Sequence, residues 1–131
     1  MSSLFTRIVQ GEIPCHKIAE DDRFLAFLDI RPIRLGHALV IPKEEIDYFF
    51  DLDDKRIGDI MRFAKPVAKA IEQAVPCKRV GVIVVGLEVP HAHVHLVPIK
   101  QIGDINFANA HAVDDEELAE TAGAIRALLK K

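Results

Sequence analysis

Three histidines alternate with apolar residues in the segment His91-Ala92-His93-Val94-His95-Leu96-Val97. Successive side chains of an extended strand point to opposite faces, so the imidazoles share one face and the apolar residues share the other. Only one face of such a strand can pack into an ordinary core. The segment therefore predicts a sheet that carries a core on one side and a row of imidazoles on the other.

A structural role and a metal site compete with a catalytic explanation of this row. One histidine in a strand is usually a satisfied, half-buried residue, but three in register are not, because each ring nitrogen needs a partner. Two imidazoles at positions i and i+2 with a third ligand suit zinc, yet the segment has no Asp, Glu or Cys, and the chain lacks HExxH and CxxC motifs. A phosphate group fits better, because one ring can attack it while its neighbours donate hydrogen bonds to its oxygens.

Length and charge limit the number of domains and the kinds of partner that the chain can have. The 131 residues, 50% of them hydrophobic, predict one domain that folds without disulfides or metal. A formal charge of −3 argues against binding to nucleic acid backbones. No run of about 20 apolar residues and no apolar leader is present. With Cys15 and Cys77 as the only cysteines, we expect a soluble cytoplasmic protein without nucleic acid or membrane partners.

The first half of the chain predicts a short helix followed by antiparallel strands. A serine before Leu4 can cap a helix that ends at Gly11. Two β-rich runs flank the turn Asp21-Asp22 and are typical of a hairpin, and a third run ends at a proline. The expected strands are 17–20, 24–29 and 37–42.

The second half predicts a long helix, two strands and a last helix. Apolar residues recur every three or four positions up to the proline at 76, which is typical of an amphipathic helix. The last helix starts with acidic residues and ends with lysines, which suits the helix dipole. This order favours an antiparallel α+β sheet over βαβ units. We expect helices from 51 or 53 to about 75 and from 114 to 131, strands 80–85 and 91–97, and a loop over 101–113.

The histidine segment resembles the histidine triad (HIT) family of nucleotide hydrolases and transferases, whose signature is His-φ-His-φ-His-φ-φ with φ apolar. Residues 91–97 match every position, and the block Gly36-His37-Ala38-Leu39-Val40-Ile41-Pro42-Lys43 looks like the purine-nucleotide-binding, Hint-type branch. The resemblance covers about 4–99 and leaves 100–131 as a divergent loop and C-terminal helix. It implies one HIT domain over 1–131: an α+β fold with a five-stranded antiparallel sheet and a long helix between strands.

The resemblance also implies a reaction. In such enzymes His93 would attack the α-phosphorus of a nucleoside 5′-phosphoramidate (AMP-N type) and form a nucleotidyl-histidine, which water then hydrolyses. The other nitrogen of His93 would donate to a main-chain carbonyl. His95 would hold the phosphoryl oxygens, His91 would lie near the leaving group and help to protonate it, and His37 would orient His95. The implied partners are a purine nucleotide, such as an AMP or GMP derivative, and a second copy in a homodimer, with no cofactor.

The nucleoside pocket carries over from the same resemblance. Asp29 matches the acid that binds the ribose hydroxyls, although a solvated turn residue is the alternative. Apolar residues match the walls around the base, and core packing accounts for part of their role. These wall residues are Phe5, Ile8, Ile13, Phe27 and Ile30.

The chain departs from the family pattern beside the triad. In the family, the residues before the triad form a glycine-rich loop that carries amide and hydroxyl side chains. This chain has a shorter connection there, Gly86-Leu87-Glu88-Val89-Pro90, which lacks those side chains. Backbone N–H groups, Asn106 or Asn109 are candidates to replace the lost contacts. A Glu88 that points into the site favours a basic leaving group, whereas one that points to solvent has no such meaning.

A second departure concerns metal. Glu45 stands where many relatives have a histidine, and the N-terminus lacks their Cys-x-x-Cys pair. We therefore expect neither a structural zinc nor any other metal.

Two alternatives stay open from the sequence. One is a dinucleoside polyphosphate hydrolase or phosphorylase of the same fold, which an inward Glu88 disfavours. The other is a nucleotide-binding module with little turnover, because the loop before the triad is reduced.

Overall fold

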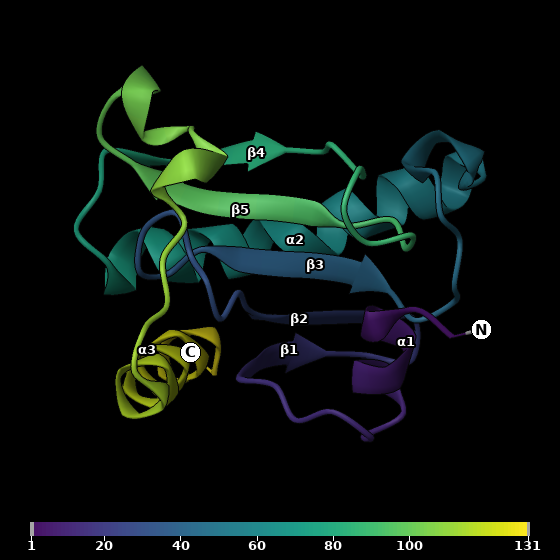
Figure 1. The fold of residues 1–131 in the computed structure, drawn as a ribbon, viewed down its shortest axis with the longest axis horizontal. Coiled ribbons are helices and arrows are strands. Elements are labelled where there is room, and N and C mark those ends of the chain that lie inside the picture. Colours follow the sequence, from purple (N-terminus) through teal and green to yellow (C-terminus); the bar gives the residue numbers. More distant parts are fainter. Residues whose placement is uncertain (1, 131) are drawn as a thin grey trace.

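The computed structural model describes residues 2–130 and contains a five-stranded sheet (Figure 1). The strand order is β1-β2-β3-β5-β4, and every neighbouring pair is antiparallel. The expected antiparallel α+β fold is therefore confirmed. The strands are β1 (Lys17–Glu20), β2 (Phe24–Leu28), β3 (Ala38–Pro42), β4 (Arg79–Ile83) and β5 (Val94–Ile99).

The long helix α2 (Asp54–Ala74) covers one face of the sheet, behind the strands in Figure 1. It begins where the Asp53 side chain accepts the N–H of Arg56 at 2.8 Å, which satisfies one of the unpaired donors of the first turn. It ends where the backbone becomes extended at Val75, before Pro76. Its buried face is Ile60, Ala64, Val67, Ala70 and Ile71.

The last helix, α3 (Asp115–Leu129), packs against α2 and β1. Leu118, Ala122 and Ile125 are buried in the core that α2 covers. Arg126 donates a hydrogen bond to the main-chain oxygen of Lys17 on β1. The helix therefore covers the β1 end of the sheet, which its sequence alone did not predict.

A smaller apolar cluster lies on the opposite face of the sheet. It joins Phe5 of the short helix α1 (Leu4–Val9) to residues of β2 and β3. Ser3 caps α1 by accepting the N–H of Thr6 at 3.0 Å, as the sequence predicts. The strand residues of the cluster are Leu25, Phe27, Leu39 and Ile41.

The histidine segment is only partly a strand, contrary to the predicted range 91–97. β5 begins at Val94, and His91 to His93 precede it, because the N–H of Ala92 bonds the main-chain oxygen of Ile46 at 2.7 Å instead of joining the ladder. The predicted separation of faces is nevertheless confirmed. Ala92, Val94 and Leu96 lie in the core under α2, whereas His95 pairs with Leu39 of the opposite-face cluster.

The remaining segments are short turns. One 3-10 turn, η1 (Phe49–Asp51), precedes α2, and two others, η2 (Ile102–Asp104) and η3 (Phe107–Asn109), interrupt the predicted loop 101–113. Strand β4 ends at Ile83, two residues before the predicted end. None of the helices within residues 2–130 is long and apolar enough to cross a lipid bilayer.

Candidate active site

A cavity of about 510 Å³ opens on the face of the sheet that carries the histidines. Its wall combines α1, the ends of β2 and β3, the connection before the triad and the η3 turn. Of the residues predicted for the site, Phe5, Asp29, Ile30, His37, His93 and His95 line it. The fold thus brings together residues that span 91 positions of the sequence.

His93 is held in one tautomer by the main chain. Its Nδ1 lies 2.7 Å from the main-chain oxygen of His91, and a carbonyl oxygen can only accept, so Nδ1 carries the hydrogen. Nε2 therefore keeps the lone pair of the neutral ring. The ring of Phe5 packs edge-on against His93 with centroids 5.0 Å apart.

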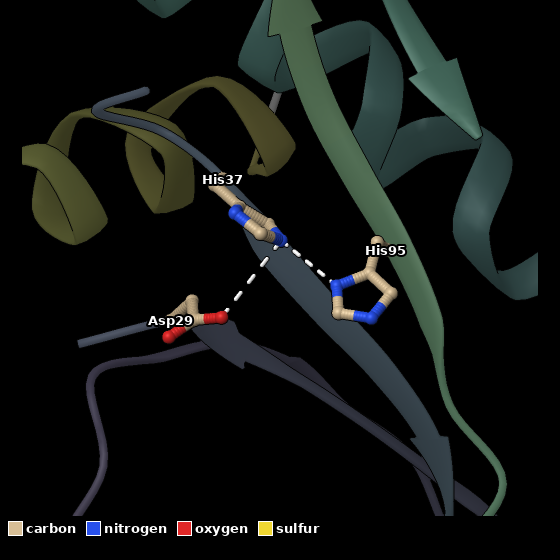
Figure 2. Close-up of side chains that lie close together, drawn as sticks. All are labelled: Asp29, His37 and His95. Atoms are coloured by element: carbon tan, nitrogen blue, oxygen red, sulfur yellow. Dashed lines mark hydrogen bonds and ion pairs between the residues drawn. The ribbon is translucent and has the colours of Figure 1, made fainter. Parts of the chain in front are cut away.

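His95 takes the opposite tautomer because of His37. The N–H of Ile33 donates to Nδ1 of His37 at 3.0 Å, so a neutral His37 carries its hydrogen on Nε2. That Nε2 lies 2.9 Å from Nδ1 of His95 and donates to it, which leaves the hydrogen of His95 on Nε2. Figure 2 shows this second nitrogen of His95 pointing away from His37. We call the hydrogen-bonded pair of rings, His37 and His95, the relay. The relay presents an N–H donor beside His93.

Both relay rings are neutral at physiological pH. Burial first, and then the neighbouring His95 and His93 rings, together lower the pKa of His37 to about 3. Burial lowers the pKa of His95 to about 4, with His93 as the second cause. Neutral rings keep the single donor and single acceptor on which the relay depends.

Asp29 lies beside the relay, just past the end of β2. Its Oδ1 accepts the N–H of Arg31 at 2.9 Å, and its Oδ2 lies 3.8 Å from Nε2 of His37 (Figure 2). Burial raises the pKa of the Asp29 carboxyl, and the charge of Glu88 acts in the same direction. A carboxylate held in this way on a cavity wall can accept hydrogen bonds from hydroxyl groups.

Asp29, His37 and His95 also place potential metal-ligand atoms within 4.8 Å of one another. A neutral imidazole has one lone pair, and His37 uses it to accept the N–H of Ile33. The Nε2 that faces the other two residues therefore carries a hydrogen and cannot bind a metal unless the Ile33 bond breaks. The donor set fits a hydrogen-bond relay better than a metal centre.

The structure does not bring His91 to the cavity. The ring is fully buried, with Nε2 2.7 Å from the main-chain oxygen of Pro42 and Nδ1 2.8 Å from the Ser3 hydroxyl. Both ring nitrogens are therefore engaged inside the protein. This geometry does not suit the expected proton transfer from His91 to a leaving group.

Three of the predicted wall residues also lie off the cavity surface. Phe27 is buried under Phe5, with ring centroids 5.7 Å apart. Ile8 packs against the same apolar cluster, and Ile13 is half-buried in the turn after α1. Phe27 and Ile8 therefore support the wall from behind rather than form its surface.

Several lining residues were not predicted from the sequence. The most informative is Phe107, whose ring meets His95 edge-on with centroids 5.1 Å apart. The only sign of it in the local sequence is an isolated aromatic residue between Asn106 and Asn109. Asn106, a candidate for contacts to the phosphate, uses its side chain to accept the N–H of Ala108. The others are Leu4, Arg31, Leu39, Val85, Gly86, Leu87, Val89 and Ala110, and Glu88 lines the cavity as well.

Comparisons with known proteins identify relatives of this chain. The chain is 45% identical over 100 residues to adenosine 5′-monophosphoramidase of Schizosaccharomyces pombe, covering 75% of this chain and 74% of the relative. It is 36% identical over 100 residues to adenosine 5′-monophosphoramidase of Saccharomyces cerevisiae, covering 72% and 61%. The crystal structure of a Hit-like protein involved in cell-cycle regulation from Bartonella henselae superposes with a TM-score of 0.86 at 30% identity, covering 97% and 96%.

The fold thus recurs in the solved structure from Bartonella henselae. The HIT domain matches residues 10–102, which is most of the chain and includes the whole histidine segment. The chain belongs to the HIT domain family.

Proposed function

We propose that the chain hydrolyses nucleoside 5′-phosphoramidates of the AMP-N type through a covalent intermediate on His93. The observation that carries the proposal is the 2.7 Å bond from Nδ1 of His93 to the carbonyl of His91, which leaves Nε2 free as a nucleophile on a cavity wall. The 45% identity to a relative named as an adenosine 5′-monophosphoramidase supports this choice of substrate.

The reaction divides into two displacements. Nε2 of His93 forms a bond to the α-phosphorus, the phosphorus–nitrogen bond breaks, and the amine leaves with a proton that its nitrogen takes from solvent. Water then attacks the phosphorus of the nucleotidyl-histidine, its hydroxyl stays on the mononucleotide, its other proton returns to solvent, and the bonding pair returns to Nε2 as its lone pair. Imidazole is a better nucleophile than water in the first step and a better leaving group than the amine in the second, so two easier steps replace one difficult attack by water.

His95 would stabilise the charge on the phosphoryl oxygens. Its Nε2–H is oriented by His37 across 2.9 Å and lies on a ring whose centroid is 4.9 Å from that of His93. Because both relay rings stay neutral, this donor needs no reorganisation when charge develops in the transition state. His37 would be a positioning residue rather than a catalytic one.

The nucleoside would occupy the part of the cavity near Asp29. The Asp29 carboxylate would accept the ribose hydroxyls, and Phe5 and Ile30 would provide apolar surface for a purine. Ile30 is 64% exposed, so it offers surface that a base can cover.

Glu88 bears on the leaving group because it lines the same cavity. A carboxylate there repels a further phosphate and attracts an ammonium group. This favours phosphoramidates of basic amines over dinucleoside polyphosphates.

We also propose that the active form is a homodimer. β4 is an edge strand, and it and the chain after it expose Val82, Val84 and Val85 by 52%, 39% and 48%. An uncovered apolar edge of this kind favours pairing with a second copy. Light scattering should give twice the mass of the chain, and a monomer that is fully active would contradict the proposal.

A fluorogenic adenosine 5′-phosphoramidate tests the reaction directly. The wild-type protein should release AMP and amine, and protein denatured at alkaline pH, where the phosphorus–nitrogen bond of a nucleotidyl-histidine is stable, should carry an adenylyl group on His93. His93→Ala should lose both signals, whereas His111→Ala, which changes an exposed histidine, should keep them. AMP binding without turnover above the His93→Ala level would instead support a nucleotide-binding module.

A further inference from the structure

Four side chains beside the histidine segment form a hydrogen-bonded cluster, which we name the N-terminal clasp: Ser3, Thr6, Glu45 and His91. Glu45 Oε1 accepts the main-chain N–H of Ser3 at 2.6 Å and the hydroxyl of Thr6 at 2.7 Å. The Ser3 hydroxyl lies 2.8 Å from Nδ1 of His91, and the Thr6 hydroxyl lies 3.3 Å from the same atom. The clasp therefore ties α1 to two segments that lie far along the chain.

The hydrogen positions in the clasp follow from its acceptors. The carbonyl of Pro42 can only accept, so Nε2 of His91 donates to it and Nδ1 holds the lone pair. Thr6 directs its single hydroxyl hydrogen to Glu45, so the Ser3 hydroxyl donates to His91. Burial lowers the pKa of His91, which keeps the ring in this neutral form.

The clasp holds a part of the chain that the sheet does not hold. His91 lies outside β5, and its N–H bonds the oxygen of Val89 rather than a neighbouring strand. Its carbonyl is nevertheless the acceptor that fixes His93, at 2.7 Å. The place of that carbonyl therefore depends on the two hydrogen bonds of the His91 ring and on the N–H of Ala92.

Phe5 couples the clasp to the cavity wall. It lies on α1 between Ser3 and Thr6, and its ring packs edge-on against both His91 and His93, with centroids 5.8 Å and 5.0 Å apart. A change in the clasp would therefore reach His93 from two sides, through the His91 carbonyl and through the ring of Phe5.

We propose that Ser3, Thr6 and Glu45 are positioning residues for His93, which act by fixing the carbonyl of His91 and hence the tautomer of the nucleophile. The proposal rests on the nucleophilic role of His93 proposed above. Without a fixed acceptor at Nδ1, the His93 ring is free to carry its hydrogen on Nε2, and that tautomer has no lone pair aimed at phosphorus.

The test combines kinetics with NMR of protein labelled with ¹⁵N-histidine. Wild-type protein should show His93 as the Nδ1–H tautomer and His91 as the Nε2–H tautomer. The double variant Ser3→Ala/Thr6→Val removes both hydroxyl donors, so His93 should become a mixture of tautomers. Its kcat should fall about tenfold, while its KM should stay within about twofold of the wild-type value. The loss of the correct His93 tautomer affects the transition state more than substrate binding.

A matched control is available next to the clasp. Glu44 adjoins Glu45, but its carboxylate pairs with Arg56 of α2. Glu44→Ala should keep the wild-type tautomers and kcat. A folded double variant with the wild-type His93 tautomer, or with wild-type kcat, overturns the proposal.

Single substitutions at Glu45 keep the test decisive if the double variant does not fold. Glu45→Gln retains an acceptor oxygen and should keep most of kcat, whereas Glu45→Ala should lower kcat and shift the His93 tautomer. Equal kcat and tautomers in Glu45→Ala and wild type overturn the proposal. A wild-type protein that fails to cleave phosphoramidates, with a His93 tautomer that still responds to the clasp, overturns the proposed function and supports the clasp.

Discussion

His37 donates its Nε2–H to Nδ1 of His95 across 2.9 Å, and this bond links the start of β3 to β5. The direction of the bond follows from the N–H of Ile33, which occupies the other nitrogen of His37. Two neutral rings thereby link the main-chain N–H of Ile33 to the Nε2–H donor of His95. The relay is the part of the site whose chemistry is most completely fixed by its surroundings.

His37→Ala should therefore reduce turnover without removing the nucleophile. Nδ1 of His95 loses its donor, so the ring is free to rotate or to change tautomer, and kcat should fall about tenfold or more. Steady-state kinetics with an adenosine phosphoramidate measures this, and His111→Ala is the control. Wild-type kcat in His37→Ala would show that His95 needs no orientation.

Protein stability should decrease when the pH falls below about 6.5. The folded-state pKa values of His37 and His95 are lowered to about 3 and about 4, so these rings stay neutral where the unfolded chain already takes up protons. Their contribution is present above the unfolded pKa and is lost as pH falls towards the folded values. The slope approaches about 1.4 kcal/mol per pH unit for each ring.

Urea unfolding between pH 7 and pH 5 checks this slope. His37→Phe, which lacks one of the two titrating rings, should show a shallower dependence than wild type. A free energy of unfolding that is constant over this range would mean that the rings titrate alike in both states.

Asp29→Ala should weaken nucleotide binding more than it slows the chemical step. The carboxylate accepts ribose hydroxyls in the proposed complex, and the loss of hydrogen bonds to a charged group corresponds to about 10-fold to 100-fold in affinity. Calorimetry with AMP measures the loss, and 2′,3′-dideoxy-AMP is the matched ligand. Asp29→Ala should not discriminate between the two ligands; a variant that still prefers AMP would place the ribose elsewhere.

Glu88→Gln should change the choice of leaving group. With the carboxylate neutralised, kcat/KM for the phosphoramidate of an amine that carries a second, cationic group should fall about fivefold. The value for the phosphoramidate of a neutral amine of similar size should change little. Competition between the two phosphoramidates gives the ratio. An unchanged ratio would indicate that the Glu88 carboxylate faces solvent when substrate is bound.

Phe107→Ala should lower kcat/KM for the phosphoramidate severalfold, by about 1 kcal/mol, the size of an edge-on aromatic contact. The ring packs on His95, so its loss removes one constraint on the phosphate donor and opens that side of the cavity. Ile102→Ala, which changes an 89% exposed residue of the same segment, is the control. Equal kcat/KM values for both variants and wild type would exclude Phe107 from the site.

The sequence determined which face of each element is apolar, because side-chain alternation and helical periodicity are local properties of the chain. The spacing of histidines separated His95 from Val94 and Leu96 before any contact was known, and Asp53 marked the start of α2 as it stands in the structure. The same local rules give no information about which distant groups meet at a hydrogen-bond distance.

Only the tertiary structure decided how the site is completed. His91 lies outside the strand because the N–H of Ala92 bonds the main-chain oxygen of Ile46, and its ring bonds Ser3 and Pro42, which lie 88 and 49 positions away. Phe107 reached His95 because the segment after β5 folds back over the cavity, although it has no periodic pattern. These contacts join residues that are far apart in the sequence, so local sequence patterns do not predict them. They form only when the sheet brings the residues together.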